Sequence, residues 1–196
     1  MTPTDIRVVH QFVDVALQKL RDVDLMRLPY ANMPLEMQDE TGTSEDDWLP
    51  WKPVPSTVTD SDITELEAKT KLRYPDLYKE FLHYKHFYDL WPQQEINFFR
   101  HGIYEWKAKL LARYFDAWDP SKLIEQGLIY FADYSDWGIV CFDANSQNKE
   151  DHDCPVVMID HELLHSEPVP KQVLYPSFAA MMYSLVADQQ DSNVPD

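Results

Sequence analysis

The chain opens with an amphipathic pattern that predicts a helix. Apolar residues recur there at steps of three and four positions, the spacing that places them on one face of an α-helix. They are Ile6, Val9, Val13, Leu17 and Leu20. Thr4 is expected to cap the start of this helix. A stripe this narrow requires a partner surface, and we expect it to pack against the core of the same domain.

The apolar periodicity stops between Leu28 and Pro55. Five prolines interrupt this stretch, and six carboxylates between positions 36 and 47 make it acidic. This composition predicts a long loop with little regular structure. Trp48 and Trp51 are expected to anchor the loop against the fold, because indole rings bury large areas. The alternative is that both are exposed for a partner.

Three further helices are predicted before the chain becomes rich in strand-forming residues. Thr59 and Asp62 have the spacing of a capping box and start the first of them. Pro75 suits the first turn of the second, because its missing N–H is not needed there. The third is marked by an apolar series from Ile103 to Ala117.

Short apolar runs rich in strand formers predict four strands, the first of which precedes the helix at residues 103–117. They are Ile96–Phe99, Leu128–Ala132, Gly138–Phe142 and Pro155–Ile159. The second and third runs flank a five-residue turn region and are expected to form a hairpin. A closing helix is predicted from Ser177, and residues 188–196 are expected to form a disordered tail.

Helices followed by strands and one closing helix predict an α+β fold. We expect a mostly antiparallel sheet of about 4–6 strands with helices packed on one side. In this division residues 57–187 form the main domain. Residues 1–56 are an N-terminal helix and an acidic, proline-rich loop appended to it.

The charge balance restricts the kinds of partner. The 196 residues include 34 Asp and Glu but 17 Lys and Arg, a net charge of −17. Nucleic-acid binding needs basic residues that neutralise phosphates, so no nucleic-acid partner is expected. The acidity either serves solubility or attracts a basic protein, and composition leaves both explanations open. No apolar stretch could span a bilayer and no secretory signal is visible, so we expect a cytoplasmic protein without membrane contact.

One short motif resembles a catalytic metal site. The run His161-Glu162-Leu163-Leu164-His165 matches a zinc-hydrolase signature, in which both histidines share one helical face and the glutamate is the general base. Here an apolar strand ends directly before the motif, and Pro168 and Pro170 follow it. At most about two helical turns fit between them. We therefore expect a turn that packs its leucines, with a zinc-dependent hydrolase using His161, Glu162 and His165 as an alternative.

Other combinations of reactive residues lack a second cluster. The run Asp151-His152-Asp153-Cys154 gathers metal-ligand types, but in a polar loop that is better explained as a solvated turn. Two cysteines do not make a disulfide framework, and four glycines are too few for a glycine-rich phosphate loop. We expect no catalytic residue, no cofactor and no metal site, and hence a protein that is not an enzyme.

A series of short stretches has the order found in one superfamily. They are Ile63–Glu67, Tyr74–Leu82, Ile129–Asp133, Trp137–Gly138, Cys141–Asp143, Pro155–Glu162 and Ser177–Phe178. Together they resemble the SUKH superfamily, whose members include yeast cell-wall regulators and many bacterial immunity proteins. The resemblance runs from about Thr57 to Val186 and implies a SUKH-like fold.

The resemblance also implies a protein partner. Bacterial members bind and neutralise toxins, often nucleases, and an acidic inhibitor would be steered toward a basic toxin. Asp133, Asp136, Trp137 and Asp143 are the expected contacts, because a tryptophan among carboxylates resembles an interface anchor. These residues could instead only build the turn and pack on the sheet. An intracellular scaffold or regulatory module, as in the yeast members, is the alternative function.

Overall fold

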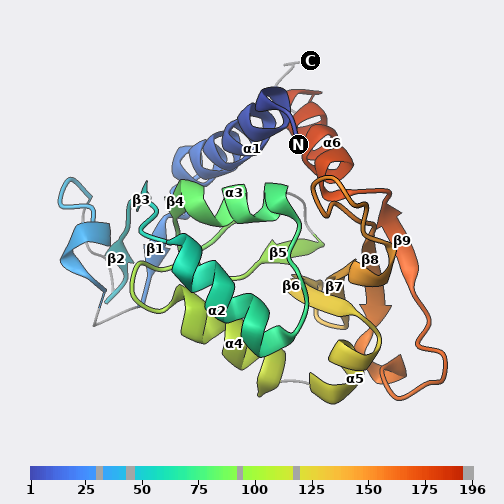
Figure 1. Ribbon diagram of the computed structural model, residues 1–196. Coiled ribbons are helices and arrows are strands. Elements are labelled where there is room, and N and C mark those ends of the chain that lie inside the picture. Colours follow the sequence, from blue (N-terminus) through green and yellow to red (C-terminus); the bar gives the residue numbers. More distant parts are fainter. Residues whose placement is uncertain (30–32, 43–46, 92–94, 117–119, 192–196) are drawn as a thin grey trace.

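The computed structural model describes residues 1–29, 33–42, 47–91, 95–116 and 120–191, and in them six helices accompany an antiparallel sheet (Figure 1). The helices are α1 (Pro3–Asp22), α2 (Asp60–Thr70), α3 (Asp76–Tyr84), α4 (Trp106–Phe115), α5 (Pro120–Glu125) and α6 (Phe178–Asp191). The strands are β1 (Arg27–Leu28), β2 (Leu49–Pro50), β3 (Val54–Pro55), β4 (Lys85–His86), β5 (Ile96–Phe98), β6 (Leu128–Tyr134), β7 (Gly138–Asp143), β8 (Val156–Asp160) and β9 (Gln172–Tyr175). The 3₁₀ turns are η1 (Leu35–Met37), η2 (Ala144–Ser146) and η3 (His161–Leu163). The chain stays helical through Asp191, beyond the expected start of the tail, and residues 192–196 lie outside the described ranges.

The main sheet has the strand order β5-β6-β7-β8-β9, and every neighbouring pair is antiparallel. The predicted α+β class and antiparallel sheet are confirmed, and the four predicted strands correspond to β5 to β8. Pairing of β6 with β7 continues to Tyr134 and Gly138, so the hairpin turn is Ser135–Trp137, three residues and not five. The edge strand β9 was not predicted.

Both faces of the main sheet are covered, which explains why its central strands are apolar throughout. On β7, Phe142 belongs to the main core, whereas its neighbour Cys141 points to the opposite face and belongs to a second core. The helices α1, α3 and α6 pack on one side of the sheet, as predicted, and their apolar residues lie in the main core. In addition, Tyr114 of α4, Leu123 of α5 and the segment 164–169 contribute to the second core.

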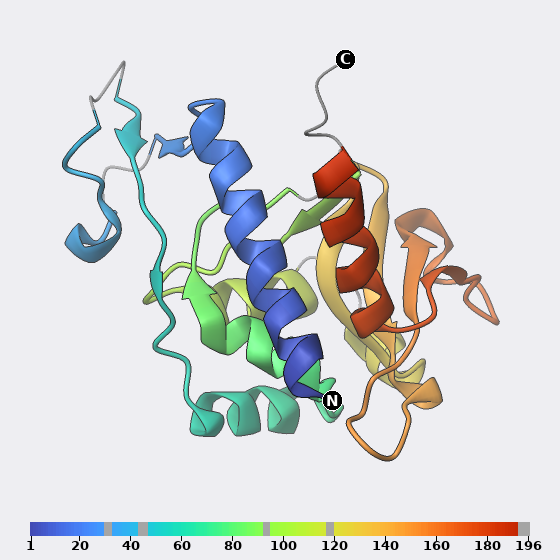
Figure 2. The same ribbon diagram turned by 90° about the horizontal axis from the view of Figure 1, so that it is seen from above.

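Helix α1 belongs to the main core although it precedes the predicted domain. It packs against α6 and α3 (Figure 2), and Phe12 on its inner face is fully buried. Its cap is Thr2 and not the expected Thr4. The Thr2 hydroxyl accepts a hydrogen bond from the Asp5 N–H at 3.3 Å, and Pro3 then occupies the first helical position, where proline is favoured.

The two tryptophans of the N-terminal loop have different environments. Trp51 is buried and meets the Tyr88 ring edge-to-face at 5.8 Å, so it anchors the loop as expected. Trp48 is 46% exposed, and the expectation that it anchors the loop is wrong. The two residues are three positions apart in an extended segment, where such side chains face opposite sides. The loop is also more regular than predicted, because β1 pairs with β2 and β3 with β4.

Candidate protein-binding surface

The turn between β6 and β7 and the turn after β8 lie together at one end of the main sheet. Gly138 on β7 pairs with Asp160 on β8, and the His161 N–H donates to the Trp137 carbonyl at 3.2 Å. The carbonyl of Glu95, just before β5, accepts a hydrogen bond from the same hairpin turn at 2.6 Å. We call this surface the hairpin end. It consists of Glu95, Tyr134, Ser135, Asp136, Trp137, Asp160, His161, Glu162 and Leu163.

Two apolar side chains of the hairpin end are exposed to solvent. Trp137 and Leu163 are each 41% exposed. Tyr134 supports the indole, since its ring meets Trp137 edge-to-face at 5.4 Å and its hydroxyl donates to Glu95 Oε2 at 2.5 Å. The hydrogen bond to this carboxylate raises the pKa of Tyr134. An indole already held on one side loses little conformational freedom when a partner covers its other side.

Four carboxylates belong to the hairpin end together with the two exposed apolar side chains. They are Glu95, Asp136, Asp160 and Glu162. None of the four forms an ion pair with a residue that the structure describes. Uncompensated carboxylates create a negative potential over this end of the sheet. An apolar anchor within a charged surround is the arrangement found at the centres and rims of protein interfaces.

Three of the residues singled out by the sequence lie at or beside the hairpin end. Asp136 and Trp137 form its turn, and both side chains are exposed. Asp133 lies on the flank of the hairpin, where its carboxylate accepts a hydrogen bond from the Tyr130 hydroxyl and lies 3.6 Å from the Arg113 guanidinium. The Asp133 side chain is therefore engaged within the protein, whereas Asp136 and Trp137 are available to a partner.

Asp143 lies at the opposite end of β7. It pairs with Leu128, and the Lys171 amine donates to its Oδ2 atom at 3.1 Å. Since a strand rises about 3.3 Å per residue, the six positions of β7 separate Asp143 from Gly138 by roughly 17 Å. Asp143 is therefore outside the hairpin end, and its predicted contact role finds no support in this geometry.

Sequence reasoning missed the contribution of Glu95 and of the segment Asp160–Leu163. A signal for the latter was present, because β8 follows β7 and pairs antiparallel with it. Because antiparallel strands run in opposite directions, the residues after the end of β8 lie next to the hairpin turn at the start of β7. For Glu95 no comparable signal exists, since its position depends on the pairing of β5 with β6.

The zinc-hydrolase signature has a geometry that does not suit zinc. Its first residues form the 3₁₀ turn η3, and the Asp160 carboxylate accepts from the Glu162 N–H at 2.9 Å. Because this segment is not an α-helix, His161 and His165 do not share a helical face. In the ranges that the structure describes, no three His, Cys, Asp or Glu side chains gather as a metal site. Leu164 packs inward as expected, but Leu163 is exposed, so the expectation that both leucines pack is wrong for Leu163.

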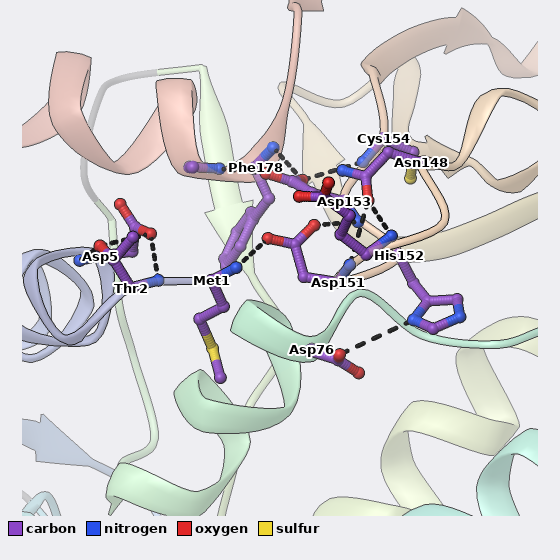
Figure 3. Close-up of polar contacts among 12 residues, drawn as sticks. Met1, Thr2, Asp5, Asp76, Asn148, Asp151, His152, Asp153, Cys154 and Phe178 are labelled. Atoms are coloured by element: carbon purple, nitrogen blue, oxygen red, sulfur yellow. Dashed lines mark hydrogen bonds and ion pairs between the residues drawn. The ribbon is translucent and has the colours of Figure 1, made fainter.

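The carboxylate of Asp153, in the other run of metal-ligand types, caps a helix. It accepts hydrogen bonds from the backbone N–H groups of Phe178 at 2.8 Å, Ala179 at 3.2 Å and Cys154 at 2.9 Å (Figure 3). The first two begin α6, so a loop residue satisfies donors that the helix cannot satisfy itself. The expectation of a solvated turn is wrong for Asp153, which is buried.

The same loop contacts the starts of two further helices. The Asp76 N–H, at the beginning of α3, donates to the Asp151 carbonyl at 2.9 Å, and the Asp151 carboxylate binds the Met1 amino group beside α1 (Figure 3). His152 Nδ1 lies 3.7 Å from Asp76 Oδ2. The segment Asp151–Asp153, which we call the capping loop, therefore joins the amino ends of three helices, where negative charge is stabilising.

The architecture and the hairpin end place the chain among α+β proteins built on an antiparallel sheet. Residues 57–184 match the model of the SMI1 / KNR4 family (SUKH-1), and the chain belongs to this family. The predicted resemblance is thus confirmed, and membership is consistent with an immunity-type or regulatory protein. No curated protein matches the chain. Across the described ranges, no helix combines the length and apolarity needed to cross a membrane.

Proposed function

We propose that this protein is an immunity protein that binds and neutralises a cognate bacterial toxin, with the hairpin end as its contact surface and without catalysis of its own. The observation that carries the proposal is the pair Trp137 and Leu163, exposed among four carboxylates that lack ion pairs within the described residues. Family membership supports it, because the superfamily includes bacterial immunity proteins.

A basic nuclease is the toxin class that fits this surface best. The chain carries a net charge of −17, and the carboxylates of the hairpin end add a local negative potential. A nuclease presents a cationic groove to the phosphates of its substrate. Occupation of that groove by the hairpin end would exclude the substrate, so neutralisation in the cytoplasm requires binding alone.

The test replaces Trp137 with alanine and measures, by calorimetry, binding to the product of the neighbouring open reading frame. We expect binding to weaken by about 30- to 1000-fold, the range for truncation of a central interface indole. Trp48→Ala is the matched control, because Trp48 has a similar exposure and lies outside the hairpin end. Its affinity should equal that of the unmodified protein.

Two results would contradict the proposal at different levels. Equal affinity of Trp137→Ala and Trp48→Ala would remove the hairpin end as the contact surface. If the unmodified protein neither binds the neighbouring gene product nor inhibits its activity, the assignment as an immunity protein fails.

A scaffold or regulatory module is the second candidate, favoured by apolar side chains exposed outside the family match. Val23, Leu25 and Leu35 are all exposed and precede residue 57. A scaffold would recover several weak partners in a pull-down, and Leu35→Ala would reduce that recovery. An immunity protein would recover one tight partner whose binding does not depend on Leu35.

A further inference from the structure

A cleft of about 560 Å³ opens between α4 and the segment that contains β5, next to the hairpin. This volume lies within the range of roughly 300–1,000 Å³ that is typical of small-ligand sites. Phe99 and Trp91 supply its aromatic surface, and one face of α4 supplies a polar wall. Of the four residues that the sequence assigns to partner contact, only Asp133 lines the cleft. None of the residues that define the hairpin end lines it, so the two surfaces are separate.

Three basic side chains from two elements line this cleft. Arg100 follows β5, while Lys109 and Arg113 lie four positions apart on α4 and therefore on the same helical face. A chain with 34 acidic and 17 basic residues thus presents three of its cations at one concave site. The same lining includes three carboxylates, so the cleft has balanced charge in a chain of net charge −17, and its cations are the groups that an anionic ligand can contact.

The donors of these cations are only partly used. Arg100 lies 3.5 Å from Asp89, and Arg113 lies 3.6 Å from Asp133. Both distances exceed the roughly 2.7–2.9 Å of a charge-assisted hydrogen bond. Each guanidinium carries five N–H donors and is about half exposed, so donors remain beyond the single carboxylate contact. Lys109 has no ion pair with any residue in the described ranges.

The aromatic lining provides a surface for the body of the ligand. The Arg113 guanidinium lies 5.8 Å from the centroid of the Phe99 ring, a cation–π distance that holds this cation above the ring. Trp91, which also lines the cleft, is 48% exposed. A planar ring placed between these side chains would bring its acidic substituent to the basic groups.

We propose that this cleft binds a small aromatic monoanion, a carboxylate or a sulfonate, held by Arg100, Lys109 and Arg113 over Phe99 and Trp91. Asp89, Asp116 and Asp133 also line the cleft, which disfavours ligands of higher negative charge such as phosphate monoesters. The site does not depend on the proposed toxin binding, and its test uses no toxin.

The test measures binding of anilinonaphthalene sulfonate, an aromatic monoanion, to the full chain by its fluorescence. Phenylnaphthylamine, which has the same ring body and no sulfonate, is the neutral comparison probe. We expect Arg113→Gln and Lys109→Gln each to weaken binding of the sulfonate by about tenfold, the effect of removing one charged contact. Binding of phenylnaphthylamine should stay unchanged.

Matched controls remove the same charges elsewhere. Arg73 and Lys149 are exposed and lie outside the cleft, so Arg73→Gln and Lys149→Gln should leave sulfonate binding unchanged. The proposal would be overturned if Arg73→Gln and Lys149→Gln weakened sulfonate binding as much as Arg113→Gln and Lys109→Gln do. It would also be overturned if Arg113→Gln and Lys109→Gln left sulfonate binding unchanged.

A measurement on the unmodified chain keeps the proposal testable if a variant does not fold. Benzoate should displace anilinonaphthalene sulfonate, whereas benzamide, which has a similar shape and no charge, should not. Equal displacement by both compounds, or by neither, would overturn the proposal, because the cleft would then not recognise the anionic group.

Discussion

His86 and His101 lie with their ring centroids 4.7 Å apart in the interior, where burial lowers the pKa of both rings and favours their neutral forms. The Thr57 N–H donates to His86 Nε2 at 2.9 Å, so His86 carries its proton on Nδ1 and donates it to the His101 carbonyl at 2.9 Å. His101 Nε2 donates to the Leu82 carbonyl at 2.9 Å. Burial, reinforced by the neighbouring His86, lowers the pKa of His101 to about 3.

This lowered pKa predicts that stability falls in mild acid. Above the ordinary pKa of 6.5 both states bind the same number of protons at His101. As the pH falls from 6.5 toward 3, the unfolded state takes up a proton that the folded state does not. The free energy of unfolding should then decrease by about 1.4 kcal/mol per pH unit from this residue. Urea unfolding at pH 7 and pH 5 measures the effect.

The control for this prediction is His101→Phe. The Leu82 carbonyl also accepts a hydrogen bond from the Ser56 hydroxyl at 2.7 Å, so the substitution does not leave it unpaired. We expect a loss of about 1 kcal/mol at pH 7 and a smaller change between pH 7 and pH 5. The same pH dependence in both proteins would show that His101 is not its source.

Asp153 allows a graded test of the cap of α6. Asp153→Asn keeps one carbonyl oxygen, and we expect it to lower the free energy of unfolding by about 1 kcal/mol. Asp153→Ala removes every acceptor and should cost about 2–3 kcal/mol, because buried N–H groups then lack partners. Thermal unfolding by circular dichroism gives both values. Glu150→Ala, an exposed neighbour, should change nothing, and an equal loss in all three would contradict the capping role.

The two kinds of cap show why only some residue contacts could be predicted from the sequence. The Thr59–Asp62 capping box was predicted and is confirmed, because both partners lie within one helical turn. Asp153 contacts Phe178 across 25 positions, and only the folded chain brings them together. The neutral state of His86 and His101 depends in the same way on distant backbone groups.

At the scale of elements, α1 is expected to contribute strongly to stability. Phe12 is fully buried, and its ring lies 5.7 Å from that of Phe98 on β5. We expect Phe12→Ala to lower the free energy of unfolding by about 3–5 kcal/mol, the cost of a large cavity in a packed core. Gln11→Ala, on the exposed face of the same helix, should change it by less than about 0.5 kcal/mol.

Chemical denaturation of the full chain distinguishes these outcomes. If Phe12→Ala is no less stable than Gln11→Ala, then α1 is an appendage, as the sequence suggested, and the domain begins near residue 57. That boundary remains a prediction, since the family match begins at residue 57 but the main core includes residues before it.

A helix or strand could be predicted from the sequence where its own residues carry the apolar pattern of that element. The strands β6, β7 and β8 have continuous apolar runs because both of their faces are buried. β9 was missed because two of its four residues are exposed, the other two are only partly buried, and the strand lies at the edge of the sheet. The candidate site was predicted where it is contiguous, at Asp136 and Trp137. It was missed at Asp160–Leu163, which joins the site only through strand pairing.

For the whole molecule, the charge of −17 predicts how the proposed association depends on salt. Steering acts on encounter, so the association rate with a basic toxin should fall as ionic strength rises. Asp136→Asn with Glu162→Gln should lower that rate by about two- to fivefold at low salt, with little change in dissociation. Trp137→Ala should instead speed dissociation, because its contact forms after encounter.

Surface plasmon resonance at several salt concentrations separates these rates. A double substitution that changes only dissociation would show that the two carboxylates make direct contacts and do not steer. Rates that do not depend on salt would leave solubility as the explanation for the acidic composition.

The packing of α1 on α6 has a consequence for how the protein is made. The Tyr183 hydroxyl donates to Asp5 Oδ1 at 3.1 Å across 178 positions. During translation, α1 is therefore synthesised long before α6, the helix on which it packs. At about 5–20 residues per second, that interval lasts on the order of 10–40 s. Throughout it the part of the apolar face of α1 that packs on α6 lacks its partner on the nascent chain. Ribosome-associated chaperones should therefore engage α1, and chains that stall before α6 should be prone to aggregate.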